Sequence, residues 1–228
     1  MKVSIVIPVY NEESTIEEIV RRVLSSPLEK EIIIVDDGST DKTRTHLGEI
    51  AKTEPHIRMI FHERNQGKAA ALRSGFKEIT GDFVLIQDAD LEYNPGDYDK
   101  LLEPLLDGRA DVVFGSRFLG GPHRVLFFWH YVGNKLLTLV SNMMYNINLS
   151  DMETGYKAFR KKILDKIVFR SNRFGFEPEF TAKVAKRGFR IYEVPISYSG
   201  RTYDEGKKIT WLDGLKGIFF ILWFRLFD

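Results

Sequence analysis

The 228-residue chain contains no cysteine. Disulfide bonds, thiolate zinc sites and cysteine nucleophiles are therefore excluded. Long apolar runs are also missing: the longest is IFFILWF at 218–224, well short of the roughly 18 residues that a membrane-spanning helix needs. The opening MKVSIVIPVYNEES lacks the apolar core and cleavage site of a signal peptide. We therefore expect a cytoplasmic protein, because a reducing compartment suits a chain without disulfides.

The chain also lacks a strong net charge, which is +1 with histidines neutral. No global field attracts a polyanion, so we expect no nucleic-acid partner. A charged ligand must instead be bound by local clusters of charged side chains.

Two nucleotide-binding motifs are missing as well. The Gly-Lys pair at 67–68 would belong to a phosphate-binding loop only with Gly at 62 and Ser or Thr at 69, where this chain has His62 and Ala69. A G-x-G-x-x-G fingerprint follows none of the predicted strands. These absences argue against ATPase and dinucleotide-binding functions.

The first half of the chain alternates between strand and helix patterns. Short runs of β-branched and other apolar residues predict buried strands at 3–9, 31–37, 57–63, 83–87 and 110–116. Segments with helical periodicity lie between them, which indicates an α/β fold with a mostly parallel sheet. The second half is less regular: we expect helices at 129–147, 176–188 and 211–228, a short strand and a helix within 151–167, and a strand within 189–199.

Polar clusters follow the predicted strands at their carboxyl ends. They read PVYNEE, DDGSTD, HERNQGK, QDADLE and GSRF. In open α/β sheets ligands bind outside the carboxyl ends of the strands, so these clusters should line one crevice.

Three acids crowd the end of the strand at 83–87. In extended backbone residues i and i+2 point the same way, so Asp88 and Asp90 can present both carboxylates to one point, with Glu92 continuing the line. Oxygen-only ligands suit a hard divalent cation, Mg²⁺ or Mn²⁺. The alternative is a turn or helix cap, as NPGD just after them suggests.

Further charged residues stand near other strand ends. Asp37 in VDDGSTD could accept hydrogen bonds from a base or ribose, or could simply form a turn. The loop GRTYDEGKK holds Arg201 and Lys207, and such cations opposite an acid-bound metal suit a diphosphate leaving group. An ordinary exposed loop is the alternative.

Taken together and in order, VSIVIPVYNEE, VDDGSTDKT, NQGKAAAL, DADLE, GSRF and DMETGYKAFR resemble glycosyltransferase family 2. The resemblance is closest to the branch that makes dolichyl-phosphate or polyprenyl-phosphate hexoses, and it covers nearly the whole chain. It implies a GT-A fold, a nucleotide-sugar donor, a divalent cation and inversion at the anomeric carbon.

The resemblance also implies residue roles. It places the metal at Asp88, Asp90 and Glu92, and it makes Arg117 a ligand of the acceptor phosphate. Nucleotide-sugar contacts fall on these positions: Pro8, Tyr10, Glu12, Val35, Asp37, Lys68, Asp88, Arg201 and Lys207.

The acceptor decides whether a general base is needed. A lipid phosphate, with its second pKa near ~6, is largely ionised already and needs positioning more than deprotonation. A hydroxyl acceptor needs a base, for which Asp151 and Glu153 in SDMETGYK are the candidates; capping a helix or pairing with Arg160 are their alternative roles. We therefore expect Asp90, Arg117, Asp151 and Glu153 at the reacting centre, a lipid-phosphate acceptor, and a sugar or protein hydroxyl as the alternative acceptor.

Two departures from the family limit the interpretation. The Q-x-x-R-W signature of processive polysaccharide synthases is absent, which argues against a polymerase. The spanning C-terminal helices of some relatives are replaced by one segment with an apolar stripe: Trp211, Leu212, Leu215, Phe219, Leu222, Trp223 and Leu226. This helix could lie in the cytoplasmic membrane interface as a peripheral contact, or pack in the core, or form a homodimer contact.

For domain organisation we expect a single GT-A domain over 1–208. Its nucleotide-sugar half is 1–116 and its acceptor half is 117–208, and an amphipathic helix follows at 209–228. A sugar nucleotidyltransferase is disfavoured, because it wants a Gly-rich basic loop where this chain reads VYNEES.

Overall fold

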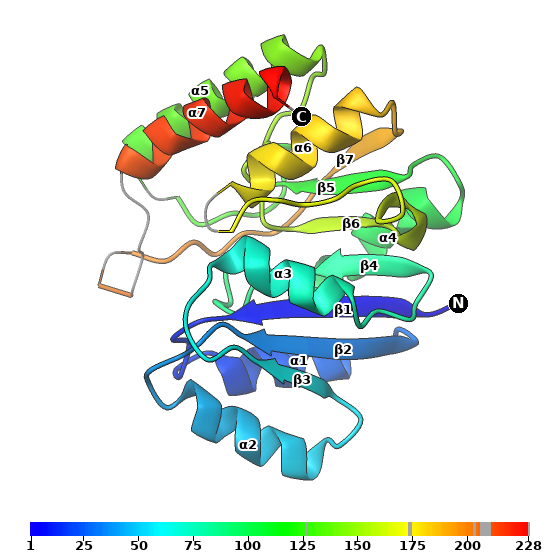
Figure 1. Ribbon diagram of the computed structural model, residues 1–228, viewed down its shortest axis with the longest axis vertical. Coiled ribbons are helices and arrows are strands. Elements are labelled where there is room, and N and C mark those ends of the chain that lie inside the picture. The colour runs from blue at the N-terminus through cyan, green and yellow to red at the C-terminus, as the bar shows by residue number, and fades with distance from the viewer. Residues whose placement is uncertain (126, 173–174, 203, 206–210, 228) are drawn as a thin grey trace.

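The computed structural model describes residues 1–125, 127–172, 175–202, 204–205 and 211–227, without the side chains of 211 and 212. Its centre is a seven-stranded sheet flanked by helices on both faces (Figure 1). The mostly parallel α/β fold predicted from the sequence is confirmed.

The strands lie in the spatial order β3-β2-β1-β4-β6-β5-β7. Their bounds are β1 Val3–Val9, β2 Lys30–Asp36, β3 Arg58–Phe61, β4 Phe83–Ile86, β5 Val112–Ser116, β6 Lys157–Arg160 and β7 Ile191–Pro195. The helices are α1 Ile16–Ser25, α2 Thr43–Thr53, α3 Lys68–Phe76, α4 Tyr98–Leu106, α5 Phe128–Tyr145, α6 Phe176–Lys186 and α7 Trp211–Leu226, with 3₁₀ turns η1 Pro95–Asp97 and η2 Lys161–Ile163.

Strand β6 is the exception to the parallel arrangement. It runs antiparallel between β4 and β5, which are neighbours in the sequence but not in the sheet. The segment DMETGYKAFR therefore enters the middle of the sheet and brings its loop beside the end of β4. After β6 the predicted helix is only the single turn η2, which corrects the expectation for 151–167.

Alternate residues of the strands bury into two cores, as the period of two requires. Ile5 and Ile7 pack under α1, α2 and α4, whereas Val6 and Val35 pack under the face formed by α3, α5, α6 and α7. Because both faces are covered, the central strands are apolar almost throughout.

Helices α5 and α7 lie side by side at the outer edge of the second face (Figure 1). The hydroxyl of Tyr145 on α5 donates to the backbone carbonyl of Ile221 on α7 at 2.6 Å. Ile221 and Phe224 are buried, so part of α7 is a core helix. None of the helices in the described ranges is long and apolar enough to cross a membrane.

Candidate active site

The acids predicted at the end of β4 lie at the carboxyl edge of the sheet. Lys68, the first residue of α3, holds Asp88 at 2.8 Å and Glu177, on the first turn of α6, at 3.1 Å. Although burial opposes the charged form, the two carboxylates raise the pKa of Lys68 above its usual range. Lys68 is thus a fixed cation beside the first aspartate.

The second aspartate is bound by the loop that follows β7. The Arg201 guanidinium reaches Asp90 at 3.2 Å and Glu12 at 3.1 Å, and its backbone N–H donates to Glu92 at 2.8 Å. Its Nε is buried and makes no hydrogen bond with any described residue; it lies 3.6 Å from Glu92. Arg201 therefore neutralises these acids while its Nε is left without a hydrogen bond to the described residues.

The electrostatics at Asp90 favour an added cation. Burial, followed by the nearby charges of Asp88 and Glu92, raises the pKa of Asp90 to about 7, while Arg201 opposes the rise. Carboxylates that repel one another at a sheet edge are what a hard divalent ion relieves. The Asp88–Asp90 pair therefore fits Mg²⁺ or Mn²⁺.

The predicted third metal ligand has another task in this structure. Among the described residues, no group of three acids or histidines is arranged to hold a metal ion. Glu92 instead accepts hydrogen bonds from the Tyr198 hydroxyl at 2.8 Å and from the Arg201 backbone. In this structure its oxygens anchor the loop after β7, and the role of Glu92 as a third metal ligand stays a prediction.

A glycine of the β6 loop lets Asp88 approach the backbone. A Cβ at Gly155 would lie 2.1 Å from Asp88 Oδ2, so no larger residue fits without displacing the carboxylate. The Gly155 N–H donates to the Tyr93 hydroxyl at 2.9 Å. The insertion of β6 thus helps to position the aspartate.

Asp37 is more firmly held than the sequence suggested. Its buried carboxylate accepts from the backbone N–H groups of Gln66 and Gly67, at 3.0 and 2.6 Å, and contacts His62 Nδ1 at 2.7 Å. A Cβ at Gly38, which has φ +73°, would lie 2.4 Å from the backbone of Arg64. Asp37 therefore ties the end of β2 to the loop that starts α3, and its contact with a nucleotide stays a prediction.

The remaining predicted nucleotide contacts have mixed outcomes. Val35 is wrong as a side-chain contact: it is fully buried within β2, between Pro8 of β1 and Ile60 of β3. Pro8 and Tyr10 lie at and just after the end of β1, at the carboxyl edge. Lys207 lies outside the described residues.

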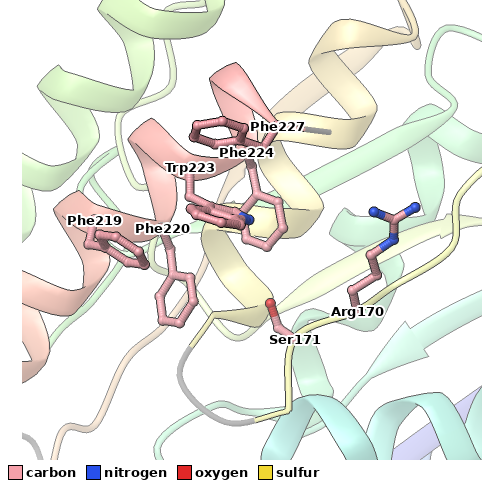
Figure 2. A pocket seen from close by; sticks show the side chains of 7 residues that line it. All are labelled: Arg170, Ser171, Phe219, Phe220, Trp223, Phe224 and Phe227. Atoms are coloured by element: carbon pink, nitrogen blue, oxygen red, sulfur yellow. The ribbon is translucent and has the colours of Figure 1, made fainter.

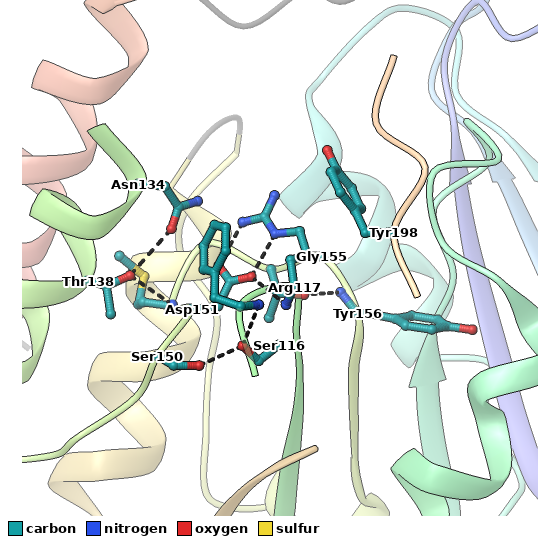
Figure 3. Close-up of polar contacts among 12 residues, drawn as sticks. Ser116, Arg117, Asn134, Thr138, Ser150, Asp151, Gly155, Tyr156 and Tyr198 are labelled. Atoms are coloured by element: carbon teal, nitrogen blue, oxygen red, sulfur yellow. Dashed lines mark hydrogen bonds and ion pairs between the residues drawn. The ribbon is translucent and has the colours of Figure 1, made fainter. Parts of the chain in front are cut away.

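Arg117 follows β5 and forms the centre of a second cluster (Figure 3). Asp151, which is fully buried, accepts from Arg117 Nε at 2.6 Å and from Nη2 at 2.7 Å. With its amide oriented to satisfy both neighbours, Asn134 of α5 accepts from Arg117 Nη2 at 2.7 Å. The ring of Tyr198 lies 5.2 Å from the guanidinium carbon.

The pairing of Asp151 with Arg117 corrects two expectations. Both oxygens of Asp151 are occupied by the guanidinium, so this carboxylate is not a free general base. The alternative pairing with Arg160 is also wrong, because Arg160 donates to the Leu105 and Ala110 carbonyls and faces Asp111 at 3.7 Å. Glu153 is placed nearby, in the loop before β6, and Arg117 and Asp151 both act on its charge.

Sequence reasoning missed three members of the site. Asn134 and Tyr198 contact Arg117, and Glu177 contacts Lys68. Glu177 stands in the first turn of a predicted helix, where an acid is ordinarily explained by the helix dipole. Nothing local marks any of the three, because each joins the site from a different distant segment.

A separate groove lies between α7 and the segment before α6 (Figure 2). Its lining is mainly aromatic: Arg170, Ser171, Phe219, Phe220, Trp223, Phe224 and Phe227. None of these residues belongs to the predicted site. The aromatic lining comes from α7 and the residue after it, so the groove is an apolar feature of that helix.

The fold and the edge acids together define a GT-A-type glycosyltransferase domain. The sequence matches the family described as glycosyl transferase family 2 over residues 4–168. The chain belongs to this family.

Individual relatives agree with that assignment. The chain is 30% identical over 212 residues to a dolichol-phosphate mannosyltransferase from Pyrococcus furiosus, an alignment that covers 91% of this chain and 59% of that relative. The chain thus spans about six tenths of the relative's length.

The fold is similar to that of glucosyl-3-phosphoglycerate synthase from Mycobacterium tuberculosis. A structure of that enzyme with Mn²⁺, UDP and glucosyl-3-phosphoglycerate has a TM-score of 0.75 and 22% identity, and the match covers 98% of this chain and 79% of the enzyme. Another, with Mg²⁺ and UDP, has a TM-score of 0.70 and 23% identity over 98% of this chain and 79% of the enzyme. These matches support the fold.

Proposed function

We propose that this chain is an inverting, metal-dependent hexosyltransferase that moves a hexose from a nucleotide-sugar to a polyprenyl or dolichyl phosphate. UDP-glucose and GDP-mannose are the candidate donors. The observation that carries the proposal is one sheet edge with two sites of opposite charge: an acid cluster at Asp88 and Asp90, and a partly buried guanidinium at Arg117. Similarity to a dolichol-phosphate mannosyltransferase supports it.

The donor diphosphate would lie at the acid cluster. A divalent cation bound there by Asp88 and Asp90 would neutralise charge that develops on the leaving oxygen. Arg201, now paired with Glu12 and Asp90, would exchange those carboxylates for the diphosphate when the acids bind the cation. The loop after β7, which carries Arg201, would thereby change its contacts when the donor binds.

The acceptor phosphate would lie at Arg117. Asp151 and Asn134 occupy Nε and Nη2, which fixes the plane of the guanidinium and leaves Nη1 to donate to an anion. A phosphate ester is already ionised near neutral pH, so positioning suffices for attack on the anomeric carbon. Asp151 acts here as a positioning residue.

The surface beside Arg117 suits a lipid. Helices α5 and α7 expose a row of large apolar side chains: Phe128, Trp129, Val132, Leu136, Leu139, Met143, Leu215, Phe219, Leu222, Trp223 and Leu226. Helix α5 also supplies Asn134 to the Arg117 cluster, so one helix links this apolar surface to the proposed phosphate site. We propose that this surface rests in the interface of the cytoplasmic leaflet as a peripheral contact.

Transfer to a hydroxyl is the second candidate, and the partly buried acid Glu153 keeps it open, since such an acceptor requires a base. The test supplies UDP-glucose or GDP-mannose, Mg²⁺ or Mn²⁺, and either a short prenyl phosphate or the corresponding prenol, with products identified by mass. We expect a prenyl-phosphate hexose and no prenol glycoside. Prenol glycoside alone, or equal yields in EDTA, would refute the proposal.

A further inference from the structure

The proposed metal site contains a cation that belongs to the chain itself. The Arg201 guanidinium lies 3.2 Å from Asp90 Oδ2, and no other described residue forms a hydrogen bond or ion pair with that oxygen. The other oxygen of Asp90 accepts from the backbone N–H of Glu92 at 3.1 Å. A divalent ion that coordinates Asp90 through Oδ2 must therefore compete with Arg201 for it.

The guanidinium of Arg201 is held by acids alone. Within the described ranges, its hydrogen bonds and ion pairs all go to Glu12, Asp90 and Glu92. This arrangement leaves Nε buried without an acceptor, which costs free energy. A diphosphate presents several oxygens to the planar donors of a guanidinium and could satisfy Nε as well. Arg201 is thus placed to exchange these acids for an anionic ligand.

Lys68, the cation beside Asp88, is fixed in a different way. It is the first residue of α3, and it binds both Asp88 at 2.8 Å and Glu177 at 3.1 Å. Arg201 instead belongs to the segment between β7 and α7, whose described residues form no helix and only an isolated bridge at Tyr198. Arg201 can therefore change its position without moving a helix, so it is the cation that can leave.

A metal ion and the guanidinium cannot share Asp90 without strong repulsion. The side chains of Asp90 and Arg201 are only 19% and 20% exposed, so water screens their charges poorly. Because both cations would contact the same carboxylate, they would stand within a few ångströms of each other. Binding of one must weaken binding of the other.

Resting on the function proposed above, we infer that Arg201 is an internal competitor of the divalent cation at the donor site. It pairs with Asp90 when no donor is bound, and it releases the aspartate when a nucleoside diphosphate offers its guanidinium another anion. Glu12, whose Oε2 lies 3.1 Å from Nη1, keeps Arg201 beside the site.

Competition of this kind makes the metal and the nucleotide bind cooperatively. The nucleoside diphosphate draws Arg201 away from Asp90 and so raises the affinity for the metal. By thermodynamic reciprocity, the metal raises the affinity for the nucleotide by the same factor. Without nucleotide the chain therefore binds a divalent ion weakly, although it presents several acids at this edge.

The experiment compares Arg201→Gln and Arg201→Lys with the wild-type chain. The affinity for Mn²⁺ is measured without nucleotide by electron paramagnetic resonance of the free ion, and the affinity for UDP and GDP is measured by calorimetry with saturating Mn²⁺. Arg124→Gln is the matched control, because Arg124 pairs with Glu205 of the same segment at 2.8 Å. Thermal unfolding confirms that each variant folds.

Without nucleotide, Arg201→Gln should bind Mn²⁺ about tenfold more tightly than the wild type, a usual size for coupling between sites. With Mn²⁺ present it should bind UDP or GDP about tenfold more weakly, because a charged hydrogen bond to the diphosphate is lost. Arg201→Lys keeps the charge and should shift both affinities less. A residue that only stabilised the loop would not move the two affinities in opposite directions.

Two results would overturn the inference. One is an affinity of Arg201→Gln for Mn²⁺, without nucleotide, that is equal to or lower than that of the wild type. The other is an equal gain in Arg124→Gln, which would assign the effect to loosening of the segment. The proposed function fails separately, if the wild type transfers no sugar to prenyl phosphate. Mn²⁺ binding separates these cases, because it reports on Arg201 whether or not transfer occurs.

Discussion

The two charged clusters at the sheet edge are built in opposite ways. The donor-side cluster brings more acids than cations together: Glu12, Asp88, Asp90, Glu92 and Glu177 against Lys68 and Arg201. The acceptor-side cluster surrounds one partly buried guanidinium with a single bidentate carboxylate and an amide. The first cluster has an excess of negative charge that a cation could neutralise. The second keeps one N–H donor of Arg117 available for an anion.

This difference predicts that substitutions in one cluster impair its own substrate site and leave the other site intact. The largest effect should come from Asp90→Asn, which removes a carboxylate from the cation site. We expect transfer to fall about 10²–10³-fold, the usual size of a lost electrostatic contact in the transition state. Fold stability should not fall, because the variant also removes repulsion from Asp88 and Glu92.

Transfer rates and UDP or GDP binding with and without Mn²⁺ measure this prediction. Asp99→Asn, an exposed acid on α4, is the matched control. Undiminished transfer by Asp90→Asn would show that the acid cluster does not serve the donor.

A smaller effect is expected from Arg117→Lys, which keeps the charge but loses the planar fork that Asp151 grips. The acceptor KM should rise about 10- to 100-fold through the loss of one or two charged hydrogen bonds, while nucleotide affinity stays unchanged. Steady-state kinetics with a short prenyl phosphate give the first number and calorimetry the second. Arg109→Lys, at an exposed ion pair, is the control; equal losses of donor and acceptor affinity would mean that the clusters are not separate.

The smallest effect should come from the apolar face. Trp129 is 78% exposed and Phe219 57% exposed. Changing either to Ser should weaken binding to lipid vesicles about tenfold, since burying a large apolar side chain contributes roughly 1.5–3 kcal/mol. Vesicle co-sedimentation is the measurement, and Phe61→Ser, 49% exposed on edge strand β3, is the control. A change of oligomeric state with unaltered vesicle binding would assign the face to a dimer instead.

The first half of the fold could be predicted closely because its signals are local. The run VSIVIPV matches β1 at both ends, and the strands at β2, β4 and β5 agree within one or two residues. Buried parallel strands must be apolar on both faces, so each is visible in its own few residues. The C-terminal helix was also predictable, yet its stripe was only half understood: Leu215 and Phe219 are exposed, while Ile221 and Phe224 enter the core.

The site was predictable to the extent that it sits at strand ends. Asp88, Lys68, Arg117 and Arg201 do reach the carboxyl edge. Their partners could not be foreseen, because an ion pair such as Arg117–Asp151 joins positions 34 residues apart, and several acids in the sequence could have filled that place.

The sequence by itself determined the alternation of strands and helices, the edge at which polar groups gather and the family to which the chain belongs, since these depend on short-range periodicity and on residue type. Only the tertiary structure decided that β6 enters the sheet antiparallel, that Asp151 pairs with Arg117, and that α5 and α7 pack side by side. Those outcomes depend on which distant surfaces meet, and the free energy of burying charges is set by that meeting and not by any local pattern.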